Sequence, residues 1–430
     1  MNIVWALLIF TVVVIIHELG HFLLARKHGI TVTEFSVGMG PRLISFEKGG
    51  TRYSIKLLPL GGSCMMVGED EVSDDPNAFN KKSVWARISV IFSGPLFNFI
   101  LAFLLSLVVI GGVGYDPAYV VQVESGSPAA VAGLQEGDLI TSFDGKRITI
   151  GRDLSNYLTY NALSEEPIEV VFQREGEKQK VVLQPTIKEA YYLGFTYYTG
   201  ENVPEIASVT AGGAMDQAGI LAGDVVLSVN GIKVANGTEL NQYFNGHPLS
   251  EEPVELEIMR NEVVETRTIT PIYGGSSYSI GMSHNVGRVK TGFFGTIKYS
   301  LNEVRYWITS TIDGLGQMVT GKVSKDDIAG TVGIVEMIGN TYEQSKEDGF
   351  FYVLMSMANI SILLTANLGV INLLPIPALD GGRMVFLIVE AFRGKPIDPE
   401  KEGIVHLIGF IALMILMVFV FYNDITRLFR

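Results

Sequence analysis

The sequence predicts a polytopic α-helical membrane protein of about four transmembrane helices, with a long folded segment outside the membrane. The chain has 430 residues, enough for two or three domains, and its hydrophobic content of 48% and mean hydropathy of +0.32 are high for a soluble protein. Four apolar runs are long enough to span a bilayer. They cover about residues 3–25, 88–113, 350–374 and 404–422.

Basic residues set the predicted orientation. Those between runs one and two and between runs three and four place both connections in the cytoplasm by the positive-inside rule. They are Arg26, Lys27, Arg42, Lys48, Arg52, Lys56, Lys81, Lys82, Arg87, Arg383, Arg393, Lys395 and Lys401. Both termini and the segment between runs two and three are then extracytoplasmic. The first run lacks a basic leader, so we expect a retained span instead of a cleaved signal.

The first run contains the pattern HELGH, with His17, Glu18 and His21. Histidines four residues apart share one helix face and can bind one zinc ion, and the glutamate beside them can act as a general base. Ionisable side chains inside a membrane span are costly and usually functional. A chance match on a buried helix is the alternative.

The external segment carries the acidity of the chain. Residues 115–285 contain 23 acidic and 10 basic residues, a difference of −13 that equals the net charge of the whole chain. This charge argues against a nucleic-acid partner and against docking of the segment on anionic lipid. Cys64 is the only cysteine, so no internal disulfide is expected.

The same segment contains a repeat. Residues 135–138 (QEGD) match residues 221–224 (LAGD) at an offset of 86, and Arg174 recurs as Arg260. Each copy predicts an α+β unit of strands, a short helix, turns and a hairpin. The glycine-rich pattern resembles PDZ domains of bacterial envelope proteases. Such domains bind extended peptides at a sheet edge, but a pair of spacer or gate domains without a peptide ligand is equally compatible.

After the repeat, residues 290–320 carry apolar side chains at helical spacing. Charged residues interrupt the pattern, so we expect an amphipathic helix on the membrane surface or packed on the core, and not a fifth span.

The third run ends in a proline-rich loop followed by LDGG. Zinc catalysis requires a third protein ligand, and the other histidines offer none; His406, for example, stands alone in the fourth run. Asp380 is placed to be that ligand, although it could instead cap the helix expected at 381–392. Asn372 offers an amide that could stabilise an oxyanion.

Taken together, HELGH, the tandem repeat and NLLPIPALDGG resemble the site-2 protease family of intramembrane zinc metalloproteases, in particular the bacterial regulator-of-sigma-E protease type. The resemblance implies one Zn²⁺ held by His17, His21 and Asp380, Glu18 as general base, and Asn372 as a residue that binds substrate or transition state. It also implies a membrane-reentrant β-hairpin over residues 35–41 and 53–62. Alternation at 53–57 supports a strand there, whose edge would pair with an unwound substrate helix. The hairpin residues implied are Gly38, Gly40, Tyr53, Ser54, Ile55, Lys56 and Leu57.

The implied function is cleavage of single-pass membrane proteins, such as anti-sigma factors or remnant signal peptides, in the bacterial inner membrane. The active site would lie toward the cytoplasm, and the PDZ pair would exclude substrates with bulky outer domains. The expected domains are a first membrane half (1–114), two PDZ domains (115–199 and 200–286), a linker (287–349) and a second membrane half (350–430). A non-catalytic PDZ adaptor with structural zinc and a zinc transporter are the alternatives.

Overall fold

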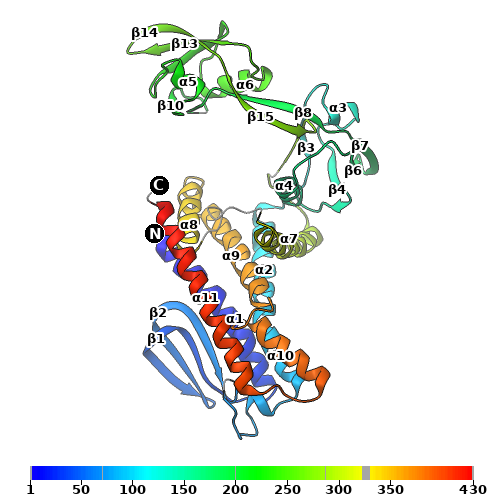
Figure 1. Cartoon of the computed structure of the whole chain (residues 1–430), viewed down its shortest axis with the longest axis vertical. Helices are drawn as coiled ribbons and strands as arrows, with labels where there is room; N and C mark the ends of the chain where they lie inside the picture. The colour runs from blue at the N-terminus through cyan, green and yellow to red at the C-terminus, as the bar shows by residue number, and fades with distance from the viewer. Residues whose placement is uncertain (1, 70, 199, 286, 322–329, 429–430) are drawn as a thin grey trace. The chain divides into compact units, whose positions relative to one another are not determined.

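The computed structural model describes residues 2–69, 71–198, 200–285, 287–321 and 330–428. Within these ranges, four helices are long and apolar enough to cross a membrane, as the sequence predicts (Figure 1). They are α1 (Asn2–Lys27), α2 (Val84–Val113), α9 (Phe350–Asn372) and α11 (Pro399–Leu428).

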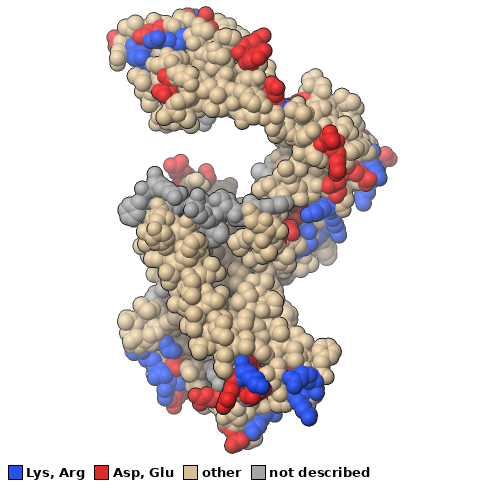
Figure 2. Space-filling model, viewed as in Figure 1, with Lys and Arg blue, Asp and Glu red and all other residues tan. Residues whose placement is uncertain are grey.

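The chain divides into a membrane unit and a strand-rich unit. The membrane unit comprises Met1–Ala118, Thr149–Asn156 and Val286–Arg430. In it α2 packs against both α1 and α9. On the face shown in Figure 2, charged side chains gather around the end that carries β1, β2 and α10, and the surface of the spans is uncharged.

A long hairpin, β1 (Val32–Lys48) and β2 (Thr51–Met66), follows α1. Residues 34–37 pair with residues 62–65 and also with residues 52–55, which in turn pair with residues 44–47. The hairpin is therefore folded over, and Tyr53, Ser54 and Ile55 have partners on both sides. The predicted strand is present, and residues 53–55 have no free edge among the described residues. Their pairing with a substrate stays a prediction, and it would require one of the two partner strands to move away.

The predicted amphipathic segment forms α7 (Phe293–Val319), which packs against α2 and α9 and is not among the candidate spans found in the described residues. A second helix, α8 (Thr331–Lys346), follows it. The Asp424 carboxylate accepts hydrogen bonds from the N–H groups of Gly330, Val332 and Gly333, and so caps the start of α8. Residues 322–329 of the predicted linker lie outside the described residues.

The strand-rich unit, Tyr119–Ile148 and Tyr157–Asn285, contains two copies of one fold. In the first, β4 (Leu139–Phe143), β5 (Lys146–Arg147), β6 (Ile168–Arg174) and β7 (Glu177–Leu183) form a sheet in the order β5-β4-β6-β7. The second copy repeats this order with β12-β11-β13-β14; these are β11 (Val225–Val229), β12 (Ile232–Lys233), β13 (Val254–Arg260) and β14 (Val263–Ile269). Both copies have the same buried ion pair, Arg174–Asp138 in the first and Arg260–Asp224 in the second. Short helices complete them, α3 (Pro128–Val131) and α4 (Gly151–Tyr160), then α5 (Ala214–Gln217) and α6 (Gly237–Gly246).

The copies exchange their last strands. β9 (Phe195–Tyr197) pairs with β10 (Ile206–Val209) of the second copy, and β16 (Met282–His284) returns to pair with β3 (Val120–Val123) of the first. A ribbon of β8 (Thr186–Tyr192) and β15 (Ile272–Ser279) joins the two. The second copy is thus inserted into the first. This arrangement differs from the predicted boundary between residues 199 and 200, because Leu193 and the strand after it pack in the second core.

Candidate metal centre

Three potential ligands converge inside the membrane unit. The Nε2 atoms of His17 and His21 lie 3.2 Å apart. An Asp380 carboxylate oxygen lies 3.1 Å from the first Nε2 and 3.5 Å from the second. Both histidines are only 7% exposed. Among the described residues, these are the one group of three or more metal-ligating side chains.

Close packing of α2 on α1 brings the histidines to this point. A Cβ added to Gly20 would lie 2.3 Å from the backbone oxygen of Ser93, and one added to Gly94 would lie 2.3 Å from Nε2 of His21. Two glycines, one on each helix, therefore permit an approach that any side chain would block.

Asp380 is the first residue of α10 (Asp380–Arg393), and the N-cap is Leu379. The carboxylate faces the two histidines, so the alternative that Asp380 is the helix cap does not describe this structure. Ion pairs between Arg87 and Glu390 and between Arg383 and Glu69 hold α10 to α2 and to the segment after the hairpin.

The far sides of both imidazole rings are also fixed. Nδ1 of His21 donates to the carbonyl oxygen of Val90 at 2.9 Å, and Nδ1 of His17 lies 3.0 Å from the Asn98 amide. The Asn98 side-chain oxygen is buried and has no hydrogen-bond partner among the described residues. The nitrogen and oxygen of an amide side chain are told apart only by their hydrogen bonds, so the Asn98 amide can be turned over. Its oxygen then accepts a hydrogen bond from Nδ1–H of His17. Both Nε2 atoms then present lone pairs.

This donor set fits zinc. Two imidazole nitrogens and a buried carboxylate oxygen, which has no hydrogen-bond partner among the described residues, form a three-ligand site of the kind found in catalytic zinc proteins. The fixed Nδ1 atoms supply the outer contacts that orient such ligands. The sequence analysis assigned neither Asn98 nor the carbonyl of Val90 to a contact with these imidazole rings, because no motif signals it.

His406, the lone histidine of the fourth apolar run, lies outside the group of three ligands but contacts the loop before Asp380. Its Nδ1 accepts a hydrogen bond of 2.9 Å from the backbone N–H of Ala378. Ala378 has a φ of 77°, which is unusual for a residue other than glycine and costs backbone strain. The C-terminal helix α11 thus holds the loop that precedes Asp380. No sequence motif signals this contact, because the two residues lie in different elements.

The other predicted site residues lie on the elements around this centre. Glu18 is partly buried on α1, where the backbone of Cys64 in β2 contacts its carboxylate. Asn372 is the last residue of α9, and it is half-buried. Gly38 and Gly40 lie in β1 with positive φ, and Lys56 and Leu57 follow the doubly paired residues of β2.

Comparison with known proteins identifies the chain. The model of peptidase family M50 matches residues 5–416. The chain belongs to peptidase family M50. Over its whole length it is 33% identical to the zinc metalloprotease RasP of Geobacillus kaustophilus, of which it covers 98%. It is also 33% identical to the regulator of sigma-W protease RasP of Bacillus subtilis, with 98% of each chain covered.

This M50 protein is therefore a zinc metalloprotease with zinc as its cofactor, which displaces the adaptor and transporter alternatives. Solved structures of similar shape include the HtrA3 PDZ domain bound to a phage-derived ligand. That structure is 19% identical, with 22% of this chain and 91% of that one covered and a TM-score of 0.17.

Proposed function

We propose that this protein cleaves single-pass membrane proteins within the bilayer of the bacterial inner membrane. The observation that carries the proposal is the position of His17, His21 and Asp380. They meet between α1 and α10, beside the apolar core of the candidate spans. A protease that acts on soluble substrates has no need to place its metal ligands in such a helix.

His17, His21 and Asp380 hold the zinc ion in this proposal. When bound, zinc polarises the scissile carbonyl group and the attacking water. The hydrogen bonds of His21 to the Val90 carbonyl and of His17 to Asn98 keep the imidazole protons on Nδ1, so that Nε2 stays available to the metal.

In this proposal Glu18 transfers protons and Asn372 stabilises the developing oxyanion. Glu18 neighbours a metal ligand in sequence, accepts the proton of the attacking water and returns it to the leaving amine. The Asn372 amide donates to the carbonyl oxygen as negative charge develops on it. Its side chain is only half-buried at the end of α9, which leaves it available for that contact.

A substrate helix must unwind before cleavage, because its carbonyl groups are bonded within the helix. We assign the compensating contacts to residues 61–66 of β2. The pairing register gives residues 62–65 strand partners on one side only, at 34–37. A Cβ on Gly62 would lie 3.1 Å from Cγ of Glu18, so this edge adjoins the proposed base. A substrate strand added here would lie beside the metal.

The substrate class follows from the relatives. One of them is named for regulation of sigma-W, and we extend this to anti-sigma factors as substrates of this chain, with remnant signal peptides as a second group. The two PDZ-like copies act as a size filter for substrates already trimmed outside, with both termini extracytoplasmic and the metal toward the cytoplasm. Their acidity and their insertion between α2 and α7 are compatible with this role.

The test is cleavage of a reconstituted single-pass reporter whose outer domain is either short or bulky. Wild type and Glu18→Gln are compared, and bound zinc is measured in each preparation. We expect zinc-dependent cleavage of the short reporter by wild type and none by the variant, with zinc retained in both. Cleavage of the short reporter by Glu18→Gln at the wild-type rate would show the assignment of the base to be wrong. If wild type cleaved the short and the bulky reporter equally, the size filter would be refuted and the assignment of the base would be unaffected.

A further inference from the structure

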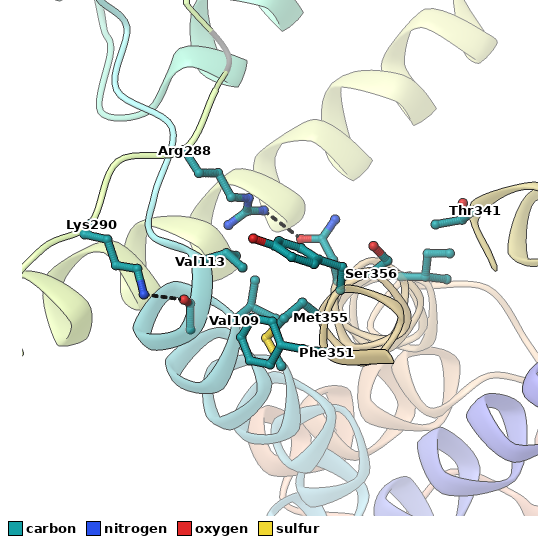
Figure 3. Close-up of a pocket in the computed structure, with 12 residues that line it drawn as sticks. Val109, Val113, Arg288, Lys290, Thr341, Phe351, Met355 and Ser356 are labelled. Atoms are coloured by element: carbon teal, nitrogen blue, oxygen red, sulfur yellow. Dashed lines mark hydrogen bonds between the residues drawn. The ribbon is translucent and has the colours of Figure 1, made fainter. Parts of the chain in front are cut away.

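A second polar site lies at the opposite end of the membrane unit from the hairpin. A cavity of about 660 Å³ is formed where α2 ends and α9 begins, and the segment that leads into α7 closes it (Figure 3). Val109 lines it from α2 and Met355 from α9, while Arg288 and Lys290 enter from the connecting segment. Because two candidate spans terminate here, the cavity lies at the depth of lipid head groups.

The two cations in this cavity contact only uncharged acceptors. The Arg288 guanidinium donates to the Gly114 carbonyl at 2.8 Å and to the Asn359 side-chain oxygen at 3.1 Å. The Lys290 ammonium donates to the Gly112 carbonyl at 2.7 Å. Within the described ranges neither makes an ion pair. Figure 3 shows both side chains extended toward the ends of the helices.

The nearest carboxylates are already engaged. Asp116 and Glu303 are each only 2% exposed, and both accept hydrogen bonds from Arg152, of 2.9 Å and 2.5 Å. Burial and the charge of Arg152 lower the pKa of Arg288, although a guanidinium stays charged at neutral pH. The cavity itself has no acidic side chain in its lining. A partly desolvated positive charge therefore lacks a contacting anion.

The rest of the cavity suits an amphiphile. Phe351 and Tyr352 line the cavity from the first turn of α9, and each is 49% exposed. Phe293 and Phe294, outside the lining, are exposed at the start of α7. Exposed aromatic residues at the ends of spans are typical of the membrane interface. The lining thus combines a cationic outer side with apolar walls that continue along two spans.

We propose that this cavity binds the phosphodiester head group of an anionic glycerophospholipid. Arg288 and Lys290 contact the phosphate, and the acyl chains follow the apolar surfaces of α2 and α9. Cationic pockets between transmembrane helices are suited to such head groups. A zwitterionic lipid fits less well, because its ammonium group would meet two cations and no carboxylate. The site is separate from the zinc centre, so it stands whether or not the proteolytic proposal holds.

The test is native mass spectrometry of the delipidated full-length protein, titrated with phosphatidylglycerol, phosphatidylcholine or inorganic phosphate. We expect one saturable phosphatidylglycerol per chain, bound at least about tenfold more tightly than phosphatidylcholine. Arg288→Gln removes a charge, and Ser356→Phe fills the cavity without changing charge. Each should weaken phosphatidylglycerol binding about tenfold or more. Lys298→Gln, an exposed lysine on α7 outside the cavity, is the matched control and should bind as wild type.

Zinc content and melting temperature show whether each variant is folded, and Ser356→Phe keeps the test valid if Arg288→Gln is not. Wild-type phosphatidylglycerol affinity in a folded Ser356→Phe variant would overturn the proposal. Equal affinity for the two lipids would also overturn it. If inorganic phosphate displaced the lipid at equal concentration, the site would be one for free anions. If a peptide with a free C-terminal carboxylate bound in its place, the occupant would be protein, and the lipid assignment would be wrong.

Discussion

The approach of α2 to the histidines gives the sharpest prediction about the zinc site. In Gly94→Ala, the new Cβ would lie 2.3 Å from Nε2 of His21 and 2.8 Å from Cε1 of His17. The first distance is about 1 Å shorter than a normal contact, and the methyl group points at the atom that should bind the metal. Zinc–nitrogen distances tolerate changes of only about 0.2 Å. We expect zinc affinity to fall at least about a hundredfold. That is the upper end of the loss seen when residues that only orient the metal ligands are replaced.

The matched control is Gly111→Ala in the same helix, where the nearest atom to a new Cβ is Cγ2 of Thr296 at 3.9 Å. Both substitutions remove a glycine from a helix interior, which by itself costs no stability. Zinc affinity is measured by competition with a chelator, and helix content by circular dichroism. Gly111→Ala should bind zinc as wild type does. If Gly94→Ala kept wild-type zinc affinity, the proposed ligand geometry would be refuted.

Three further predictions test other contacts. Asn98→Ala should lower zinc affinity about tenfold, because the imidazole it orients loses its outer partner; unchanged affinity in the chelator assay contradicts this. His406→Ala should lower kcat about tenfold with zinc retained, because the Ala378 N–H loses its acceptor. His406→Asn, whose amide oxygen can accept the same bond, should recover most of the rate if the role is positioning. Burial alone would raise the pKa of Asp224, but the hydrogen bonds from Arg260 and the Leu221 N–H lower it overall. The second copy should therefore lose stability as pH falls below about 4, where the unfolded carboxyl takes up its proton, and Arg260→Gln should flatten that dependence in thermal melts.

The sequence predicted the spans and the residues of the centre because both depend on local patterns. Apolar runs of bilayer length and two histidines at helical spacing need no long-range information. Asp380 could also be predicted from the sequence, since the prolines before LDGG break the helix and mark a special turn. Only the structure could decide between a metal ligand and a helix cap at Asp380, because the cap and the first helical position differ by one residue.

What the sequence could not give is the partner of each strand. The repeat correctly indicated two equivalent copies, but equivalence does not say which copy each strand joins. Pairing follows the path of the chain, and here β9 and β16 each complete the other copy. The hairpin shows the same limit. Alternation at 53–57 indicates a strand, while the fold-over that encloses residues 53–55 depends on contacts of residues 34–37 with two different segments.

The folded-over hairpin also explains how three requirements of the proposed reaction meet at one place. Because residues 53–55 are enclosed, the edge that remains beside α1 is that of residues 62–65. Gly62 on this edge lies against Glu18 of α1. The helix α2 approaches the same part of α1 through Gly94, which lies against His17 and His21. The same α2 is held to α10, the helix that Asp380 begins, by the ion pair of Arg87 with Glu390. In the proposed reaction the substrate strand, the base and the metal would therefore be aligned by the packing of one helix, α2.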